Sequence, residues 1–414
     1  MAHRVSIDGD GSFHPSEEQR RRWGLESGAE FLVQERPEGL LLRREDPVLA
    51  RVIVEPTNCC NLACRTCVRN SWDEPEGFMG MGVYRRLVEG LRQAHSLRRM
   101  SFWGFGEPLL HPHILEMIAL AKGLGVKVDL ITNGMLLGPK MAEALVDLEL
   151  DSLVVSADGA TPESFSDVRQ GGQLDLVRRN VEYLQALRLE SPKGKPELGI
   201  EFVAMRRNLP ELSRLRQLAV SMGASFVVVS NVLPYTEELS DEILYGWHAG
   251  TCYPVFHSRW SPDLQLPRLD RRREVLEAVS TLLEHTGENN FPVGRLEGAA
   301  GYCRFVGEGT AAITWEGKVS PCVYLMHSFS CYIMRRQKRI RAYHLGSIDG
   351  EDILTIWRKA DFAHFRKRVQ RFDFSPCTDC GGCEFAESNE EDCFGNSFPT
   401  CGDCLWAKGV LQCP

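Results

Sequence analysis

Residues 51–67, RVIVEPTNCCNLACRTC, decide the fold, because a short apolar strand there leads directly into a loop that carries Cys60, Cys64 and Cys67. Three thiolates at this C-x3-C-x2-C spacing can hold three irons of a 4Fe-4S cluster and leave the fourth iron without a protein ligand. Such an iron is open to a chelating small molecule. Cys59 would give the wrong spacing in place of Cys60, so we interpret it as a buried bystander. A zinc knuckle or a set of buried thiols is the alternative interpretation.

Outward from this loop, short apolar strands alternate with amphipathic stretches of helical length. This alternation is typical of repeated βα units around a parallel sheet. The predicted strands are 51–55, 100–104, 126–132, 152–156, 199–205 and 225–230, and the predicted helices are 83–94, 114–123, 140–148, 174–187 and 209–222. We therefore predict an α/β fold built around a partial (β/α)6 barrel of the TIM type. Ligands bind at the carboxyl ends of the strands in such sheets.

Polar and glycine-containing loops follow the predicted strands at those ends. The loop after the second strand reads WGFGEPLLHP (103–112), the third strand ends in TNG (132–134), and the fourth ends in SADGATP (156–162). Turn and capping chemistry explains each loop taken singly. Their order after the cysteine loop makes them candidate ligand contacts: Phe105, Gly106, Glu107, Asn133, Ser156, Asp158, Arg169 and, after the sixth strand, Leu233.

The cysteine loop resembles the signature of the radical S-adenosylmethionine (SAM) superfamily. In that family the open iron is chelated by the amino and carboxylate groups of SAM, and an electron from the cluster yields a 5′-deoxyadenosyl radical. Thr66 stands where family members usually carry an aromatic residue, and Phe105 replaces a usual glycine. The resemblance implies that the eight strand-end residues bind SAM, with Glu107 accepting from its amine and Arg169 reaching its carboxylate. The sequence identifies no catalytic base or hydrogen donor.

Ten of the fifteen cysteines lie between residues 303 and 413. Their arrangement, with Gly317-x4-Cys322 near its start, resembles the SPASM domain of radical SAM enzymes. The resemblance implies two auxiliary 4Fe-4S clusters with ligands among Cys303, Cys322, Cys377, Cys380, Cys383, Cys393, Cys401, Cys404 and Cys413. We expect Cys303, Cys322 and Cys404 in one cluster, completed by Cys383 or Cys393, and Cys377, Cys380, Cys401 and Cys413 in the other. A zinc ribbon formed by residues 377–380 and 401–404 is the alternative.

The chain is predicted to have four parts, namely residues 1–46, 47–238, 239–300 and 301–414. Residues 1–46 resemble the AbrB-type swapped-hairpin domain, with a strand at 5–8, a helix at 15–23 and two strands within 30–44. We interpret arginines 20–22 in that unit as a solvated helix face. Contacts with DNA phosphates are the alternative interpretation. We prefer a role in dimerisation or partner docking. Residues 239–300 are a bridging segment that is helical in part. In the tail, residues 353–369 form the one long predicted helix, and the basic insert 331–344 reads as a solvated loop or a docking surface for an acidic partner.

The composition argues against several classes of protein and indicates a compartment. A net charge of -8 argues against a general nucleic-acid binder. The sequence lacks an apolar stretch long enough to span a bilayer and the apolar region of a signal peptide, so we expect a cytoplasmic protein without a membrane partner. Fifteen cysteines in that compartment favour metal binding over disulfides.

The tail from residue 390 to 414 resembles one subgroup of radical SAM enzymes, proposed to mature tungsten-containing oxidoreductases of the aldehyde ferredoxin oxidoreductase type. The resemblance implies modification of a tungstoenzyme, its pterin cofactor or a peptide in an anaerobic cell. It also implies a low-potential electron donor, ferredoxin or flavodoxin. Two alternatives come from other classes: a zinc-binding transcriptional regulator with a DNA-binding hairpin, and a non-catalytic iron-sulfur scaffold.

Overall fold

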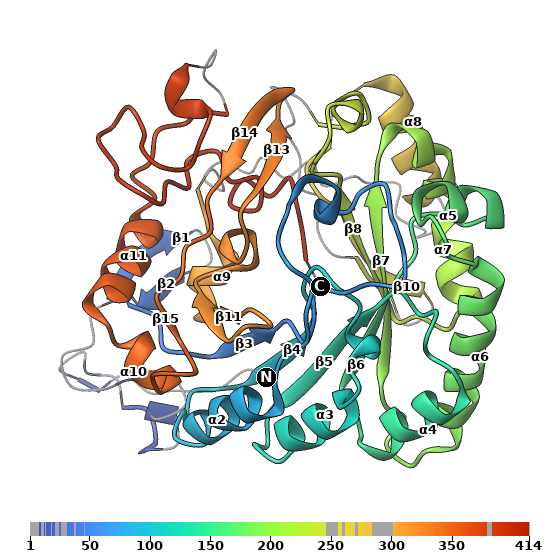
Figure 1. Ribbon diagram of the computed structural model, residues 1–414, viewed down its shortest axis with the longest axis horizontal. Coiled ribbons are helices and arrows are strands. Elements are labelled where there is room, and N and C mark those ends of the chain that lie inside the picture. Colours follow the sequence, from blue (N-terminus) through green and yellow to red (C-terminus); the bar gives the residue numbers. More distant parts are fainter. Residues whose placement is uncertain are drawn as a thin grey trace.

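An eleven-stranded mixed sheet organises the molecule, with the strand order β15-β12-β11-β3-β4-β5-β6-β7-β8-β10-β9. The computed structural model describes residues 8–9, 12, 14–17, 19–20, 25, 31–36, 39–44, 46–245, 256–258, 261–269, 272–283, 301–378 and 383–413. Helices run along the outer side of the curved sheet (Figure 1). The α/β fold predicted from the sequence is confirmed.

Six adjacent parallel strands form the centre of the sheet. They are β3 (Arg51–Val54), β4 (Arg99–Phe102), β5 (Lys127–Thr132), β6 (Ser152–Ser156), β7 (Glu197–Ala204) and β8 (Phe226–Asn231). Their residues are buried almost throughout, as expected for a sheet covered on both faces, where strands read as continuous apolar runs. All six strands were predicted from the sequence at these places.

The helices between these strands are amphipathic and pack their apolar faces on the sheet. They are α2 (Met81–Leu91), α3 (Ile114–Lys122), α4 (Pro139–Asp147), α5 (Pro162–Val168), α6 (Leu174–Glu190) and α7 (Leu212–Ser221). In α7 the buried side chains include Leu212, Leu215 and Leu218, at helical spacing. The short helix α5 was not predicted. It begins with a capping box between Thr161 and Ser164.

Strands from other parts of the chain extend this central sheet at both edges. Beyond β3 lie β11 (Thr310–Ile313), which is parallel to it, and the antiparallel β12 (Lys318–Ser320) and β15 (Gly346–Ser347). Beyond β8 lie β10 (Ser261–Gln265) and β9 (Phe256–Ser258). The bridging segment therefore contributes strands as well as its expected helix, α8 (Arg273–Leu283). The division into four parts stays a prediction, because one sheet runs through three of them.

The cysteine-rich region adds α9 (Arg304–Gly307), α10 (Ile353–Trp357), α11 (Ala360–Arg371) and the hairpin of β13 (Phe329–Ile333) and β14 (Arg336–Ile340). The single helix predicted at 353–369 is thus wrong. The chain breaks between α10 and α11, where the rings of Trp357 and Phe362 pack edge to face at 4.8 Å. The basic insert is the β13–β14 hairpin and not a loop, because alternate residues of both strands are buried.

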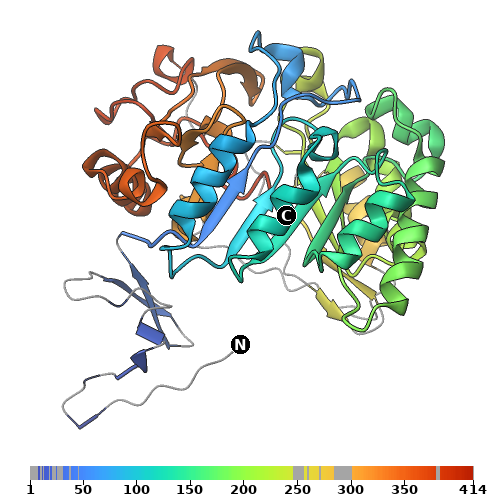
Figure 2. The same ribbon diagram turned by 60° about the horizontal axis from the view of Figure 1, so that its bottom comes forward.

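At the amino end, β1 (Phe31–Arg36) and β2 (Gly39–Arg44) pair as an antiparallel hairpin, as predicted. The hairpin lies to one side of the large sheet in Figure 2. A helical hydrogen bond joins Arg20 N–H to the Ser16 carbonyl at 2.8 Å, within the helix expected at 15–23. The strand predicted at 5–8 lies almost wholly outside the described residues. The resemblance of this unit to an AbrB-type domain stays a prediction.

Candidate active site

The thiols of Cys60, Cys64 and Cys67 line a cavity of about 270 Å³ at the carboxyl ends of the parallel strands. Successive strand ends supply the other walls. Seven of the eight residues predicted to bind SAM line the same cavity: Phe105, Gly106, Glu107, Asn133, Ser156, Arg169 and Leu233. The structure therefore brings the predicted cysteine loop and the predicted strand-end loops to one place.

Backbone hydrogen bonds fix the cysteine loop against its neighbours. Ala63 N–H donates to the Gln170 carbonyl at 3.0 Å, and Glu107 N–H donates to the Cys59 carbonyl at 2.8 Å. The Cys59 thiol donates to the Gly77 carbonyl at 3.7 Å and does not line the cavity. Cys59 is half-buried and not buried as expected, and its role as a bystander stays a prediction.

Burial raises the pKa of all three loop thiols, that of Cys67 to about 11. Neutral thiols are therefore the stable form while the loop is free of metal. Iron supplies the positive charge that would hold all three as thiolates, since a coordinating thiol is deprotonated outright. Three sulfur donors on one wall of this cavity fit a cluster with one open corner.

Gly106 and Glu107 bring the loop after β4 against the cysteine loop. A Cβ on Gly106 would lie 2.2 Å from the Thr57 carbonyl oxygen and 2.6 Å from that of Cys59, so only glycine permits this approach. The buried Glu107 carboxylate accepts from Thr132 Oγ1 and Asn133 N–H, both at 2.7 Å. Burial raises its pKa, and these hydrogen bonds partly offset that effect.

Asn133 and Ser156 line the next part of the wall. Asn133 Nδ2 donates to Asn61 Oδ1 at 2.8 Å and lies 3.9 Å from Cys60 Sγ, so the asparagine ties the end of β5 to the cysteine loop. Ser156 Oγ donates to Glu201 Oε2 at 3.4 Å.

Asp158 is the one predicted SAM contact that does not line the cavity. It lies behind Arg169, with its Oδ2 2.9 Å from Arg169 Nε, and its Oδ1 accepts from Val203 N–H at 2.8 Å. Burial raises the pKa of Asp158, whereas Arg169 opposes that rise. Asp158 therefore positions the guanidinium of Arg169, which faces the cavity.

Glu201, on β7, is a cavity residue that the sequence analysis missed. Its removal from bulk water raises its pKa to about 7, although Arg169 opposes the shift. A single carboxylate within the apolar run GIEFVAM (199–205) was the available signal, because charged residues seldom occupy a buried strand without a partner or a function.

The C-terminal tail reaches the same cavity through Leu411, Gln412 and Cys413. Trp406 Nε1 donates to Cys413 Sγ at 3.1 Å. Burial raises the pKa of Cys413 to about 12, with a further contribution from Glu201, so this thiol is protonated. Cys413, predicted as an auxiliary-cluster ligand, thus lies with the cysteines of the first loop.

A second, smaller cavity of about 20 Å³ is lined by Cys303, Cys322, Cys401 and Cys404. Its remaining lining is mostly apolar. Burial raises the pKa of Cys303 to about 11 and that of Cys404 to about 12. Four buried thiols around one space fit a 4Fe-4S cluster with four protein ligands. Cys401, expected in one cluster with Cys377, lines this cavity with Cys303, and the assignment of ligands to clusters stays a prediction.

The other predicted ligands lie further out. Ser375 Oγ contacts both Cys377 Sγ (3.4 Å) and Cys393 Sγ (3.1 Å). Cys383 is exposed. Cys380 lies outside the described residues. In the described ranges, no three His, Cys, Asp or Glu side chains are arranged to hold a single metal ion.

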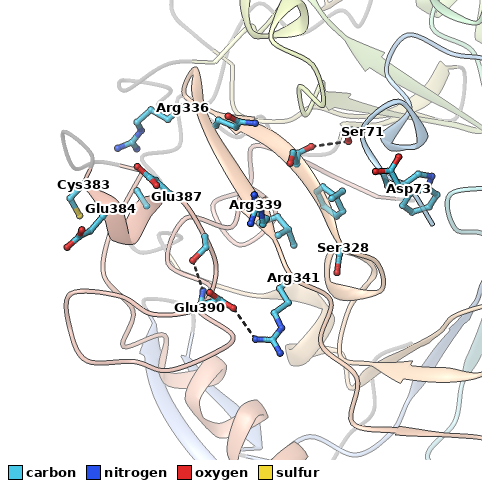
Figure 3. Close-up of a pocket in the computed structure, with 17 residues that line it drawn as sticks. Ser71, Asp73, Ser328, Arg336, Arg339, Arg341, Cys383, Glu384, Glu387 and Glu390 are labelled. Carbon is cyan, nitrogen blue, oxygen red and sulfur yellow. Dashed lines mark hydrogen bonds and ion pairs between the residues drawn. The ribbon is translucent and has the colours of Figure 1, made fainter. Parts of the chain in front are cut away.

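Cys383 also borders a large open groove of about 1270 Å³ between the β13–β14 hairpin and residues 383–390 (Figure 3). Arg341 pairs there with Glu390 at 3.0 Å, and Ser71 Oγ donates to the Ser330 carbonyl at 3.0 Å. The hairpin side of this groove belongs to the basic insert, for which a docking surface for an acidic partner was the alternative interpretation. The groove carries both signs of charge, since Glu384 and Glu387 line it as well.

His327 links this region to the end of β3. Its Nε2 lies 2.8 Å from Glu55 Oε2, and its Nδ1 contacts Glu74. These carboxylates outweigh the effect of burial and raise the pKa of His327 to about 9. A charged imidazolium therefore joins three separate segments beside the cavity.

Comparison with known families agrees with this geometry. Residues 54–194 match the radical SAM superfamily, and residues 303–384 match the SPASM iron-sulfur cluster-binding domain. The two matches confirm the radical SAM and SPASM domains that the sequence predicted. These domains imply SAM and iron-sulfur clusters as cofactors.

Among individual relatives, the tungsten-containing aldehyde ferredoxin oxidoreductase cofactor-modifying protein of Pyrococcus furiosus is 27% identical over 371 residues, which are 87% of this chain and 96% of the relative. The AdoMet-dependent heme synthase of Oleidesulfovibrio alaskensis is 23% identical over 388 residues, which are 91% of this chain and 88% of the relative.

Solved structures share the fold. SuiB of Streptococcus suis bound to precursor peptide SuiA has a TM-score of 0.53 at 15% identity, covering 81% of this chain and 70% of that one. Native anSMEcpe with bound AdoMet has a TM-score of 0.52 at 18% identity, covering 82% and 88%. Among the helices of the described residues, none is long and apolar enough to cross a membrane.

Proposed function

We propose that this enzyme cleaves SAM reductively at a 4Fe-4S cluster held by Cys60, Cys64 and Cys67. The observation that carries the proposal is that these three thiols line one cavity together with Glu107 and Arg169. When bound, the cluster and SAM supply a 5′-deoxyadenosyl radical that abstracts hydrogen from a substrate. In this proposal seven of the eight predicted strand-end residues contact the cofactor from the cavity wall, and Asp158 positions Arg169.

The chain's own residues orient the cofactor and keep water away. Arg169 is a fixed cation, held by Asp158, and suits the carboxylate of the methionyl group. Glu107 has oxygen lone pairs left beyond its three hydrogen bonds and can accept from an amine. Leu233 and the ring of Tyr235 provide apolar parts of the cavity wall.

For the auxiliary clusters we propose a new ligand grouping. One cluster is held by Cys303, Cys322, Cys401 and Cys404, which share the small cavity. The other is held by ligands among Cys377, Cys380, Cys383 and Cys393, because Ser375 already joins two of these thiols. We propose ferredoxin or flavodoxin as the electron donor and a cytoplasmic location.

The test compares Cys60→Ala with the matched control Cys59→Ala, after anaerobic reconstitution with iron and sulfide. We expect the control to keep the wild-type iron content, the electron paramagnetic resonance change on adding SAM, and 5′-deoxyadenosine formation with dithionite. Cys60→Ala should lose the spectral change and the product. If the two variants behaved alike in these measurements, the proposed role of Cys60 would be contradicted.

We further propose that the substrate belongs to a tungsten-containing oxidoreductase, as its pterin cofactor or as a peptide. The support is the similarity to the Pyrococcus furiosus protein, which spans nearly the whole of both chains. Deleting the gene in its host should leave a tungsten oxidoreductase inactive and change the mass of its cofactor. An active oxidoreductase with an unchanged cofactor would reject this substrate. The amino-terminal hairpin is proposed to serve dimerisation or docking.

A further inference from the structure

The C-terminal tail is anchored so that its penultimate residue faces the active-site cavity. Gln412 N–H donates to Ser230 Oγ at 3.0 Å, and Asn231 Nδ2 donates to the Val410 carbonyl at 2.8 Å. Both partners are at the end of β8. These bonds tie residues 410–412 to the carboxyl edge of the sheet and hold Cys413 in the wall of the cavity.

Cys413 stands apart from the cysteines that are grouped elsewhere. Four thiols line the small cavity, Cys377 and Cys393 share Ser375, and Cys331 contacts the Tyr324 hydroxyl at 3.7 Å. The contact of Cys413 is the indole N–H of Trp406. Two four-cysteine clusters can be formed by the other cysteines of the tail, so the thiol of Cys413 is not needed as a ligand.

The cavity wall that holds Cys413 also contains a polar group without a hydrogen-bond partner among the described residues. Trp103 is 9% exposed, lines the cavity, and its indole Nε1 has no acceptor among the described residues. A buried donor without an acceptor costs free energy, so this site is built to receive a polar ligand. Trp103 and Cys413 pack in the same small apolar cluster.

That apolar cluster borders both cavities. Trp103 and Val323 line the larger cavity, Phe305 lines the smaller one, and both Cys303 and Cys413 pack against the cluster. Trp406 bonds to Cys413 and follows Cys404 by two residues. Cys413 thus lies in the wall of the proposed radical site and packs against the apolar cluster that also borders the cavity of the proposed auxiliary cluster.

We propose that Cys413 is the hydrogen-atom donor that quenches carbon radicals formed in this cavity. The proposal rests on the proposed function. The S–H bond of Cys413 breaks homolytically, a C–H bond forms on the radical, and a thiyl radical remains. One electron from a reduced iron-sulfur cluster and one proton from solvent restore the thiol. A thiol suits this step because its S–H bond is weaker than the C–H bond that it makes.

The test uses SAM cleavage without substrate, in which the 5′-deoxyadenosyl radical itself meets the donor. The reconstituted enzyme is given SAM and dithionite in D2O, where thiols exchange to S–D and carbon-bound hydrogens do not. We expect wild-type enzyme and the control Cys59→Ala to release 5′-deoxyadenosine that carries one deuterium. Cys413→Ala and Cys413→Ser should lose the deuterium, since serine keeps the shape and its strong O–H bond donates no hydrogen atom.

Iron content and cluster spectra give a readout that is independent of turnover. As a hydrogen donor, Cys413 can be replaced with no loss of iron per chain or of cluster signals. Loss of about four irons in Cys413→Ser would show a cluster ligand and overturn the proposal. Undeuterated wild-type product, or deuterated product from both variants, would also overturn it. No 5′-deoxyadenosine from any protein would instead contradict the proposed function.

Discussion

Replacing Asp158 by asparagine should destabilise the protein through the buried guanidinium of Arg169. The side chains of the pair are 0% and 12% exposed and lie 2.9 Å apart. Asparagine can still accept from Val203 N–H, so the substitution removes mainly the negative charge. Breaking a buried pair in this way costs about 3–5 kcal/mol. We expect about 3 kcal/mol, the lower end of that range, because Glu201 remains near Arg169.

Asp167→Asn is the matched control. Asp167 lies on α5 and is 44% exposed, with Arg65 at 3.2 Å and Arg207 at 3.0 Å. Exposed ion pairs contribute roughly 0–1 kcal/mol. The two variants therefore make the same chemical change in settings that differ in burial.

The assay is urea unfolding of the reduced, metal-free protein under anaerobic conditions, with the midpoint and slope compared among wild type and both variants. Asp158→Asn should lower the midpoint clearly at an unchanged slope, and Asp167→Asn should lower it slightly. Equal midpoints for the two variants would refute the reasoning that burial makes the Asp158–Arg169 pair costly to break.

Three further results are expected. Gly106→Ala should cost about 1–3 kcal/mol by pushing the cysteine loop away, and should weaken the spectral change on adding SAM; a wild-type response would contradict the contact distances. The folded-state pKa of His327 is about 9 against an ordinary 6.5, so its stabilisation is complete below pH 6.5 and is lost as pH rises through 9. The urea midpoint of the wild type should therefore fall more than that of His327→Gln between pH 6.5 and 10. If the two midpoints fell in parallel with pH, a stabilising charge on His327 would be excluded. Cys303→Ser should lose about four irons and keep the SAM-dependent spectral change of the first cluster; loss of that change would show that the two sites are not independent.

Local sequence patterns were enough to predict the centre of this fold. The six strands are apolar runs of ordinary length, and the cysteine loop follows the first of them. Because parallel strands end at one edge, the candidate residues at those ends could be expected to share a cavity, and seven of them do.

These local patterns could not predict contacts between segments that are far apart in the sequence. Strand β11 joins β3 across more than two hundred residues, and Cys401 lines the same small cavity as Cys303. The spacing of these residues along the chain indicates neither of the two contacts. The break between α10 and α11 was hidden for a related reason, since the apolar spacing of residues 353–369 fits one continuous helix as well as two short ones.

The pairing of β3 with β11 also bears on how the protein can be divided. Val54 is flanked by Phe102 of β4 on one side and by Ile313 of β11 on the other. A chain shortened to end at residue 300 would leave one margin of β3 bare, with its amide and carbonyl groups open to another molecule. Such margins promote intermolecular association. The strand that leads into the first cysteine loop thus depends on the tail to cover this side, and we expect the two halves to stay soluble only when they are produced as one chain.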